Sequence, residues 1–176
     1  MLRRIAYVCA GLIAVVLAAA VYLGAFAHVQ IEEGMVGPYA LVYQEMRGTD
    51  LSRLGAITTE LDALLTRNGV VDRRPFDVFY PTDAQPNEVG FIMTARVADE
   101  TLARLAATPD VKLREVPRQR ALVTRFPWRS RLSFLIGYVK VDPALRAYRE
   151  KAGYKAAPAY ALNEGATIAY MQPVRQ

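Results

Sequence analysis

The sequence predicts an α+β domain of two repeated βαββ units, forming one antiparallel sheet with helices on one face, behind a single N-terminal transmembrane helix. Three observations lead to this fold class. The chain has 176 residues, about one domain's length. Residues 5–27 contain no charged side chain. Residues 40–54 and 121–135 resemble each other at an offset of 81 positions. We therefore expect an anchored domain with two similar halves.

The uncharged run is long enough, at about 1.5 Å per residue, to cross a hydrocarbon core of about 30 Å. Two arginines precede it, and two glutamates follow it: Arg3, Arg4, Glu32 and Glu33. Since basic residues prefer the cytoplasmic side, residues 1–4 are expected in the cytoplasm. The domain is then expected on the periplasmic side of a bacterial inner membrane. A cleaved signal peptide is the alternative, but the run exceeds the roughly 7–15 residues of its apolar region.

Composition excludes several classes of protein. Cys9 is the only cysteine and lies inside the apolar run, so we expect no intramolecular disulfide. His28 is the only histidine, which makes a His-based catalytic triad or a zinc site implausible. No phosphate-binding glycine motif occurs. A net charge of +5 is too small to indicate nucleic acid. We therefore assign no catalytic residue, metal, cofactor or nucleic-acid partner.

The first unit is expected to span residues 36–97. Residues 39–46 are rich in β-branched and aromatic side chains, as a strand requires. An apolar stripe at helical spacing follows, with Thr49 as a possible N-cap and Asn68-Gly69 as the stop. Residues 76–80 and 88–97 then predict a hairpin with a long, proline-containing loop.

The second unit is expected to span residues 116–175. Its strand is predicted over residues 118–126, and its helix starts at Ser130. Asp142-Pro143 predicts a new helix start, because proline favours the first helical position. A short helix through Leu102 and Leu105, with Asp99 as its cap, is expected between the units. The closing hairpin comprises residues 159–162 and 167–171.

The seam between two similar halves is a natural place for a cleft. Aromatic side chains on or near the predicted strands could line it, and tyrosine suits a pocket because its hydroxyl needs a partner. The offset of 81 places Tyr160 where the first unit has Phe79. The predicted ligand-binding set is Tyr43, Phe79, Phe126, Trp128, Tyr138 and Tyr160.

Five short motifs carry a resemblance to a known family. They are Val36-Gly37-Pro38-Tyr39, Phe79-Tyr80-Pro81, Phe126-Pro127-Trp128, Val141-Asp142-Pro143 with Tyr148, and Tyr170-Met171-Gln172-Pro173-Val174. Their order resembles the SOUL/GyrI-like superfamily. Together with the anchor it is similar to membrane-anchored GyrI-like proteins, such as the bacterial relatives of the animal reticulophagy receptor. The GyrI-like domain is expected over residues 34–176.

The resemblance implies a module that binds a small molecule between its two repeats. Relatives include effector-binding domains of transcription regulators, gyrase inhibitors and hydrolases. Many place a glutamate on the first hairpin strand of the second repeat, but residues 159–162 contain no carboxylate. The leading hypothesis is therefore a non-catalytic module that binds a hydrophobic or amphipathic small molecule, or a protein partner.

Two other functions stay open. A hydrolase would use a cleft carboxylate with a tyrosine, and the candidate carboxylates are Glu45, Asp77 and Glu164. An interaction protein would use the basic segment 112–131 to contact anionic headgroups at a membrane surface.

Overall fold

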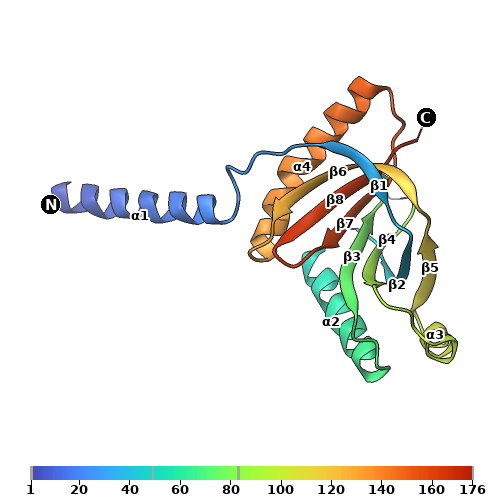
Figure 1. Cartoon of the computed structure of the whole chain (residues 1–176). Helices are drawn as coiled ribbons and strands as arrows, with labels where there is room; N and C mark the ends of the chain where they lie inside the picture. The colour runs from blue at the N-terminus through green and yellow to red at the C-terminus, as the bar shows by residue number, and fades with distance from the viewer. Residues whose placement is uncertain (1, 49, 83, 176) are drawn as a thin grey trace.

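The computed structural model describes residues 2–48, 50–82 and 84–175. One curled, eight-stranded antiparallel sheet forms its centre, in the order β1-β6-β8-β7-β3-β4-β2-β5 (Figure 1). The strands are β1 Glu32–Val36, β2 Tyr39–Met46, β3 Arg73–Phe79, β4 Asn87–Met93, β5 Lys112–Val116, β6 Gln119–Pro127, β7 Ala159–Asn163 and β8 Thr167–Pro173. The helices are α1 Leu2–Tyr22, α2 Leu51–Arg67, α3 Asp99–Ala106 and α4 Arg131–Ala152.

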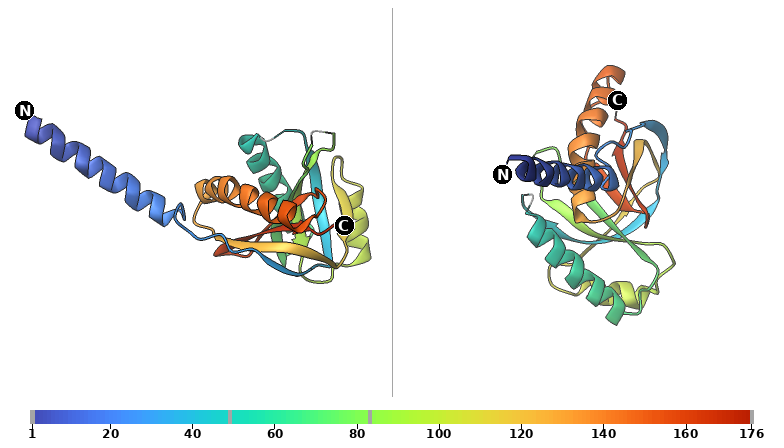
Figure 2. Two further views of the ribbon diagram at one scale, coloured as in Figure 1. Left: turned by 90° about the horizontal axis from the view of Figure 1, so that it is seen from above. Right: turned by 90° about the vertical axis from the view of Figure 1, so that its left-hand side faces the viewer.

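The α+β class and the two βαββ units are confirmed. The first unit runs β2-α2-β3-β4 and the second β6-α4-β7-β8. They meet at the centre of the sheet, where β3 pairs with β7 and Val78 lies opposite Tyr160. Helix α2 packs on β2 and β4, and α4 packs on β6 and β8, both on the outer face of the curl (Figure 2).

Two edge strands that the sequence did not predict join the units reciprocally. Strand β1 leads into β2 but pairs with β6, while β5 leads into β6 but pairs with β2. Val36 lies opposite Gln119, and Tyr39 opposite Val116. The first strand of each unit therefore pairs with the short strand that precedes the other unit in the chain.

The two links between these strands touch each other. Gly37 adopts a φ of +77°, and a Cβ atom there would lie 2.9 Å from the carbonyl oxygen of Pro117. We expect Gly37→Ala to lower the free energy of unfolding by about 1–2 kcal/mol, because alanine disfavours the left-handed region and the neighbouring backbone must also move. Urea unfolding would measure this change in free energy. Gly165→Ala provides the control, because Gly165 also has a positive φ, +89°, but no atom lies close to it, so this variant measures the effect of the backbone conformation alone.

The offset of 81 suggested by the sequence is one residue too long for the first strands. Val36 pairs with Gln119, and Tyr39 pairs with Val116. In this reciprocal arrangement Val36 corresponds to Val116 and Tyr39 to Gln119, so equivalent residues of the two units lie 80 positions apart. A slip of one residue turns every side chain in a strand to the opposite face. Accordingly Leu41 packs inside the curl, whereas its sequence match Leu122 packs under α4.

The predicted stripe of α2 is confirmed, with Ile57 and Leu61 buried against the sheet. Its cap is Asp50, whose carboxylate accepts hydrogen bonds from the backbone N–H groups of Ser52 and Arg53 at 2.8 and 3.4 Å. Thr49, the predicted cap, lies outside the described residues.

The new helix start predicted at Asp142-Pro143 is wrong, because α4 continues through Pro143 to Ala152. Proline removes the N–H group that would bond to the carbonyl of residue 139. Val139 is 63% exposed, so water can reach this side of the helix. One helix, rather than two pieces, therefore covers the second unit.

Helix α1 extends away from the sheet in Figure 1. The segment after it returns to the second unit, where Lys140 Nζ donates to the carbonyl oxygens of Ala25 and Ala27 at 2.7 Å each. Within the described part of the chain, no helix is both long enough and apolar enough to cross a membrane. The transmembrane helix predicted over residues 5–27 thus gains no support here.

Candidate small-molecule site

A cavity of about 280 Å³ lies on the outer face of the sheet, where the two units meet. Helix α2 forms one wall and the start of α4 forms the other, with β3, β7 and β8 as the floor. We call it the inter-helix cavity. Its lining residues are Leu54, Gly55, Thr58, Thr59, Pro75, Asp77, Trp128, Phe134, Ala161, Asn163 and Ile168.

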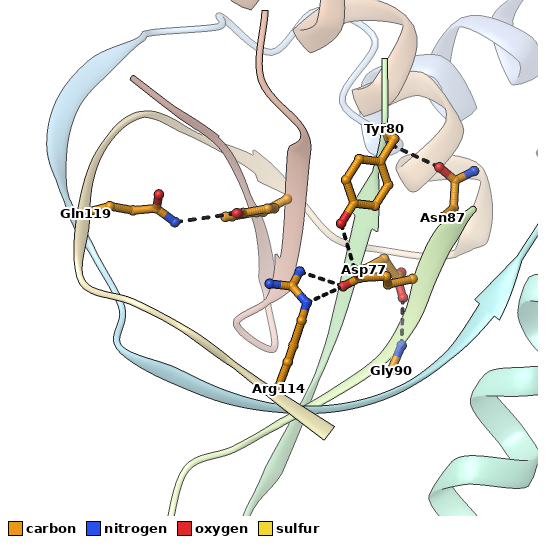
Figure 3. Close-up of polar contacts among 8 residues, drawn as sticks. Asp77, Tyr80, Asn87, Gly90, Arg114 and Gln119 are labelled. Carbon is orange, nitrogen blue, oxygen red and sulfur yellow. Dashed lines mark hydrogen bonds and ion pairs between the residues drawn. The ribbon is translucent and has the colours of Figure 1, made fainter. Parts of the chain in front are cut away.

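Asp77 is the only carboxylate in this lining. It lies on β3, opposite Ala161 of β7, and so at the junction of the units. Burial raises the pKa of the Asp77 carboxyl from 3.8 to about 7, although the backbone N–H of Gly90, 3.4 Å from Oδ1, acts in the opposite direction (Figure 3). This carboxyl can therefore change its protonation state near neutral pH.

Aromatic rings build the wall on the α4 side. Trp128 is held by its backbone N–H, which donates to the carbonyl of Ala166 at 2.9 Å. Phe134 packs between Phe79 and Tyr170, with ring centroids 6.1 and 6.2 Å away. These contacts fix the position of the apolar wall before any ligand arrives.

The six aromatic residues predicted as one lining set divide between the two faces of the sheet. Phe79, Phe126, Trp128 and Tyr138 lie on the helix-covered face, and of these only Trp128 lines the cavity. Tyr43 and Tyr160 lie inside the curl. Phe79 and Tyr160 are not equivalent, because the offset of 81 does not preserve the face of the strand.

Inside the curl, a carboxylate that the sequence analysis overlooked makes a polar cluster. Glu88 of β4 accepts a hydrogen bond from the Tyr80 hydroxyl at 2.7 Å and pairs with Arg114 of β5 at 2.5 Å. Its side chain is only 8% exposed. Burial and the Glu88 carboxylate both raise the pKa of Tyr80 well above its ordinary value, so this hydroxyl remains a donor.

The other two candidate carboxylates pair with basic residues. Glu45 pairs with Lys112 at 2.6 Å, and Glu164 with Arg125 at 2.9 Å. Arg114 and Arg120 of the same basic segment also pair with carboxylates, namely Glu88 and Glu33. Much of the positive charge in residues 112–131 is therefore matched by neighbouring strands, which weakens the case for an anionic surface as its partner.

No group of three or more histidine, cysteine, aspartate or glutamate residues is placed to hold a metal ion, as far as the described residues go. The lining of the inter-helix cavity supplies one carboxylate, one asparagine and two threonines among apolar side chains. This composition suits an apolar molecule with one polar group better than it suits an ion.

Comparison with known proteins gives likenesses of structure only. No family model and no curated protein matches the sequence. EcmrR in a complex with DNA matches with a TM-score of 0.61 at 10% identity, over 84% of this chain and 58% of the EcmrR chain. The isolated EcmrR C-terminal domain gives 0.57 at 11% identity, over 84% and 98% of the two chains. A hydrolase from Listeria innocua gives 0.54 at 11% identity, over 82% and 91%.

At these identities the likeness concerns the fold alone. It extends over nearly the whole of the EcmrR C-terminal domain and over most of this chain. The chain spans just over half of the EcmrR chain in the DNA complex. This protein therefore shares the fold of the EcmrR C-terminal domain.

Proposed function

We propose that this protein binds a small hydrophobic or amphipathic molecule in the inter-helix cavity and does not transform it. One observation carries the proposal: a partly apolar cavity at the junction of two similar units has a single, half-buried carboxyl, Asp77, on its floor. Binding pockets commonly combine apolar walls with a few polar groups that orient the ligand. The chain shares the fold of the EcmrR C-terminal domain, and its resemblance to GyrI-like proteins implies this role.

Asp77 determines which polar group the ligand should carry. Below its pKa of about 7 the neutral acid can donate a hydrogen bond, whereas above it the carboxylate attracts a cation. A cationic ligand therefore favours the ionised form and releases a proton on binding. We expect its affinity to rise between pH 5 and pH 8, and that of a neutral ligand of the same shape to stay constant.

A matched pair of ligands tests this prediction. The emission of Trp128, the only tryptophan and part of the lining, would report titrations with a phenylalkyl trimethylammonium ion and with its uncharged tert-butyl isostere. We expect the cation to bind at least tenfold more tightly than the isostere at pH 8. Asp77→Asn should abolish this difference while both ligands still bind. Failure of both ligands to change the emission or raise the melting temperature would contradict the proposal.

Hydrolysis is the second candidate, and two observations favour it. A carboxyl whose pKa is about 7 suits general acid–base work at neutral pH, and a hydrolase from Listeria innocua has a similar fold. The cavity lining contains no tyrosine, however, so Asp77 would have to act through water rather than with a tyrosine. Turnover of an electrophilic ester that Asp77→Asn abolishes, without loss of binding, would establish this function in place of simple binding.

Tethering by residues 5–27, with the domain on the periplasmic side, remains part of the proposal and rests on the sequence. The large apolar side chains of α1 that the structure describes are exposed; Leu12, Ile13 and Val15 are more than half exposed. Extraction of membranes with alkaline carbonate tests the tether, and a reporter fused after residue 176 tests the side. Release of the full chain into the supernatant, or a reporter active only in the cytoplasm, would refute these points.

A further inference from the structure

We propose a second ligand site, at the open end of the curled sheet, that takes a small organic carboxylate. A cavity of about 330 Å³ lies there, separate from the inter-helix cavity and sharing no lining residue with it. The loop after β3 and the segment before β7 form its sides. Its lining comprises Tyr80, Pro81, Thr82, Gln85, Arg114, Ala156, Ala157, Pro158, Tyr160 and Arg175.

Arg114 is the cation that the fold has fixed in position. Its Nε and Nη2 atoms both donate to Oε2 of Glu88, at 2.8 and 2.5 Å. Its guanidinium also lies 5.9 Å from the centre of the Tyr43 ring, an attractive arrangement for a cation. The third nitrogen, Nη1, makes no hydrogen bond to any described residue. In Figure 3, Arg114 reaches from β5 toward the space between Tyr80 and the Gln119 side chain.

Arg175 adds a second cation to the lining of the cavity. Its carbonyl accepts a hydrogen bond from the backbone N–H of Lys155 at 2.9 Å, which ties the end of the chain to the segment before β7. A buried hydrogen bond from Gln172 Nε2 to the carbonyl of Ala157, at 2.9 Å, fixes that same segment. The guanidinium of Arg175 is therefore attached to a well-supported backbone.

The surrounding groups define the body of the ligand. Tyr80, Tyr160, Pro81 and Pro158 are among the lining residues, and the surface of the cavity is mainly polar. The Tyr80 hydroxyl is engaged with Glu88, while the Tyr160 hydroxyl has only a long contact of 3.4 Å with Gln119. A small carboxylate fits such a lining, because guanidinium groups bind carboxylates.

Glu88 contacts two lining residues, Arg114 and Tyr80, at 2.5 and 2.7 Å, and its negative charge opposes an anion. It is not part of the described lining, in which no carboxylate occurs. Coulomb's law then predicts opposite effects for two neighbouring substitutions. Removing the charge of Arg175 should weaken the binding of an anion, whereas removing the charge of Glu88 should strengthen its binding. A role confined to supporting the fold predicts no such reversal.

The experiment uses the full chain and fluorine NMR with 4-fluorobenzoate, which reports weak binding, and its uncharged isostere 4-fluorobenzamide. We expect the benzoate to bind at least tenfold more tightly than the benzamide. Arg175→Gln should weaken the benzoate at least fivefold, and Glu88→Gln should strengthen it at least twofold. Arg118→Gln removes an exposed arginine outside the cavity and should change neither affinity. Melting temperatures establish that each variant is folded.

Three results would overturn the proposal. The first is equal binding of benzoate and benzamide. The second is a loss of affinity in Arg118→Gln as large as that in Arg175→Gln, which would indicate attraction by overall charge. The third is loss of benzoate binding in Asp77→Asn, which would place the benzoate in the inter-helix cavity. Because the two sites prefer opposite charges, failure here leaves the cation titration at Asp77 unaffected.

Discussion

Asp77→Asn is expected to stabilise the ligand-free protein at pH 8 by an amount on the order of 2–4 kcal/mol and to leave it nearly unchanged at pH 4. Burial raises the pKa of this carboxyl from 3.8 to about 7 in the folded protein. The folded state therefore holds its proton more strongly than the unfolded chain does. Stability contributed by that proton is complete below about pH 4 and is lost as the pH rises to about 7. Asparagine does not titrate and avoids this loss.

Urea unfolding between pH 4 and pH 8 measures the effect. The wild-type free energy of unfolding should fall across this range, and the slope should be reduced in Asp77→Asn. Asp72→Asn, at an exposed position in the loop before the same strand, provides the matched control and should follow the wild type. Parallel curves for the wild type and Asp77→Asn would show that burial does not raise the pKa of Asp77, and would remove the carboxyl from the ligand site as well.

Arg114→Gln is expected to lower the free energy of unfolding by about 3 kcal/mol at pH 8. Glu88 is 8% exposed and pairs with Arg114 at 2.5 Å, so removing the cation leaves a buried carboxylate without its counter-charge. The hydrogen bond from Tyr80 at 2.7 Å remains and offsets only part of the cost.

The double variant Glu88→Gln with Arg114→Gln separates charge from packing. Replacing both partners of a buried ion pair is commonly far less harmful than replacing one. We expect the double variant to recover at least half of the stability lost in Arg114→Gln. A double variant as unstable as Arg114→Gln would mean that Arg114 stabilises the protein through its contact with the Tyr43 ring and its packing, rather than through Glu88.

The order of elements within each unit could be predicted because it depends on local signals. Apolar periodicity indicated α2, and the loop prolines indicated the hairpin. Strands β1 and β5 were missed because each has five residues, two or more of them charged, and pairs with a strand about 70 or more residues away. The sequence does contain the same local pattern at β1 and at β5: a short segment ends in a valine, and a link that contains proline follows it.

The candidate site was harder to predict, because it depends on which face of a strand each residue occupies. The match at an offset of 81 aligned residues of the same type, but the matched residues of the first strands lie on opposite faces of the sheet. Asp77 was considered, yet nothing in the sequence distinguishes a cavity floor from solvent at that position. Glu88 was overlooked even though the five residues after it in the strand are uncharged and mostly apolar, and a charge in such a strand often marks a paired buried group.

The reciprocal exchange of β1 and β5 also determines how mechanical force enters this molecule. The N-terminal segment leads into β1, but β1 pairs with β6 of the second unit. Lys140 of α4 also donates hydrogen bonds to the carbonyls of Ala25 and Ala27, which precede β1. A pull on that segment therefore loads the second unit directly, along the β1–β6 ladder and the helix that forms one wall of the inter-helix cavity. The first unit, although nearer in sequence, receives the load only through the link between Val36 and Tyr39.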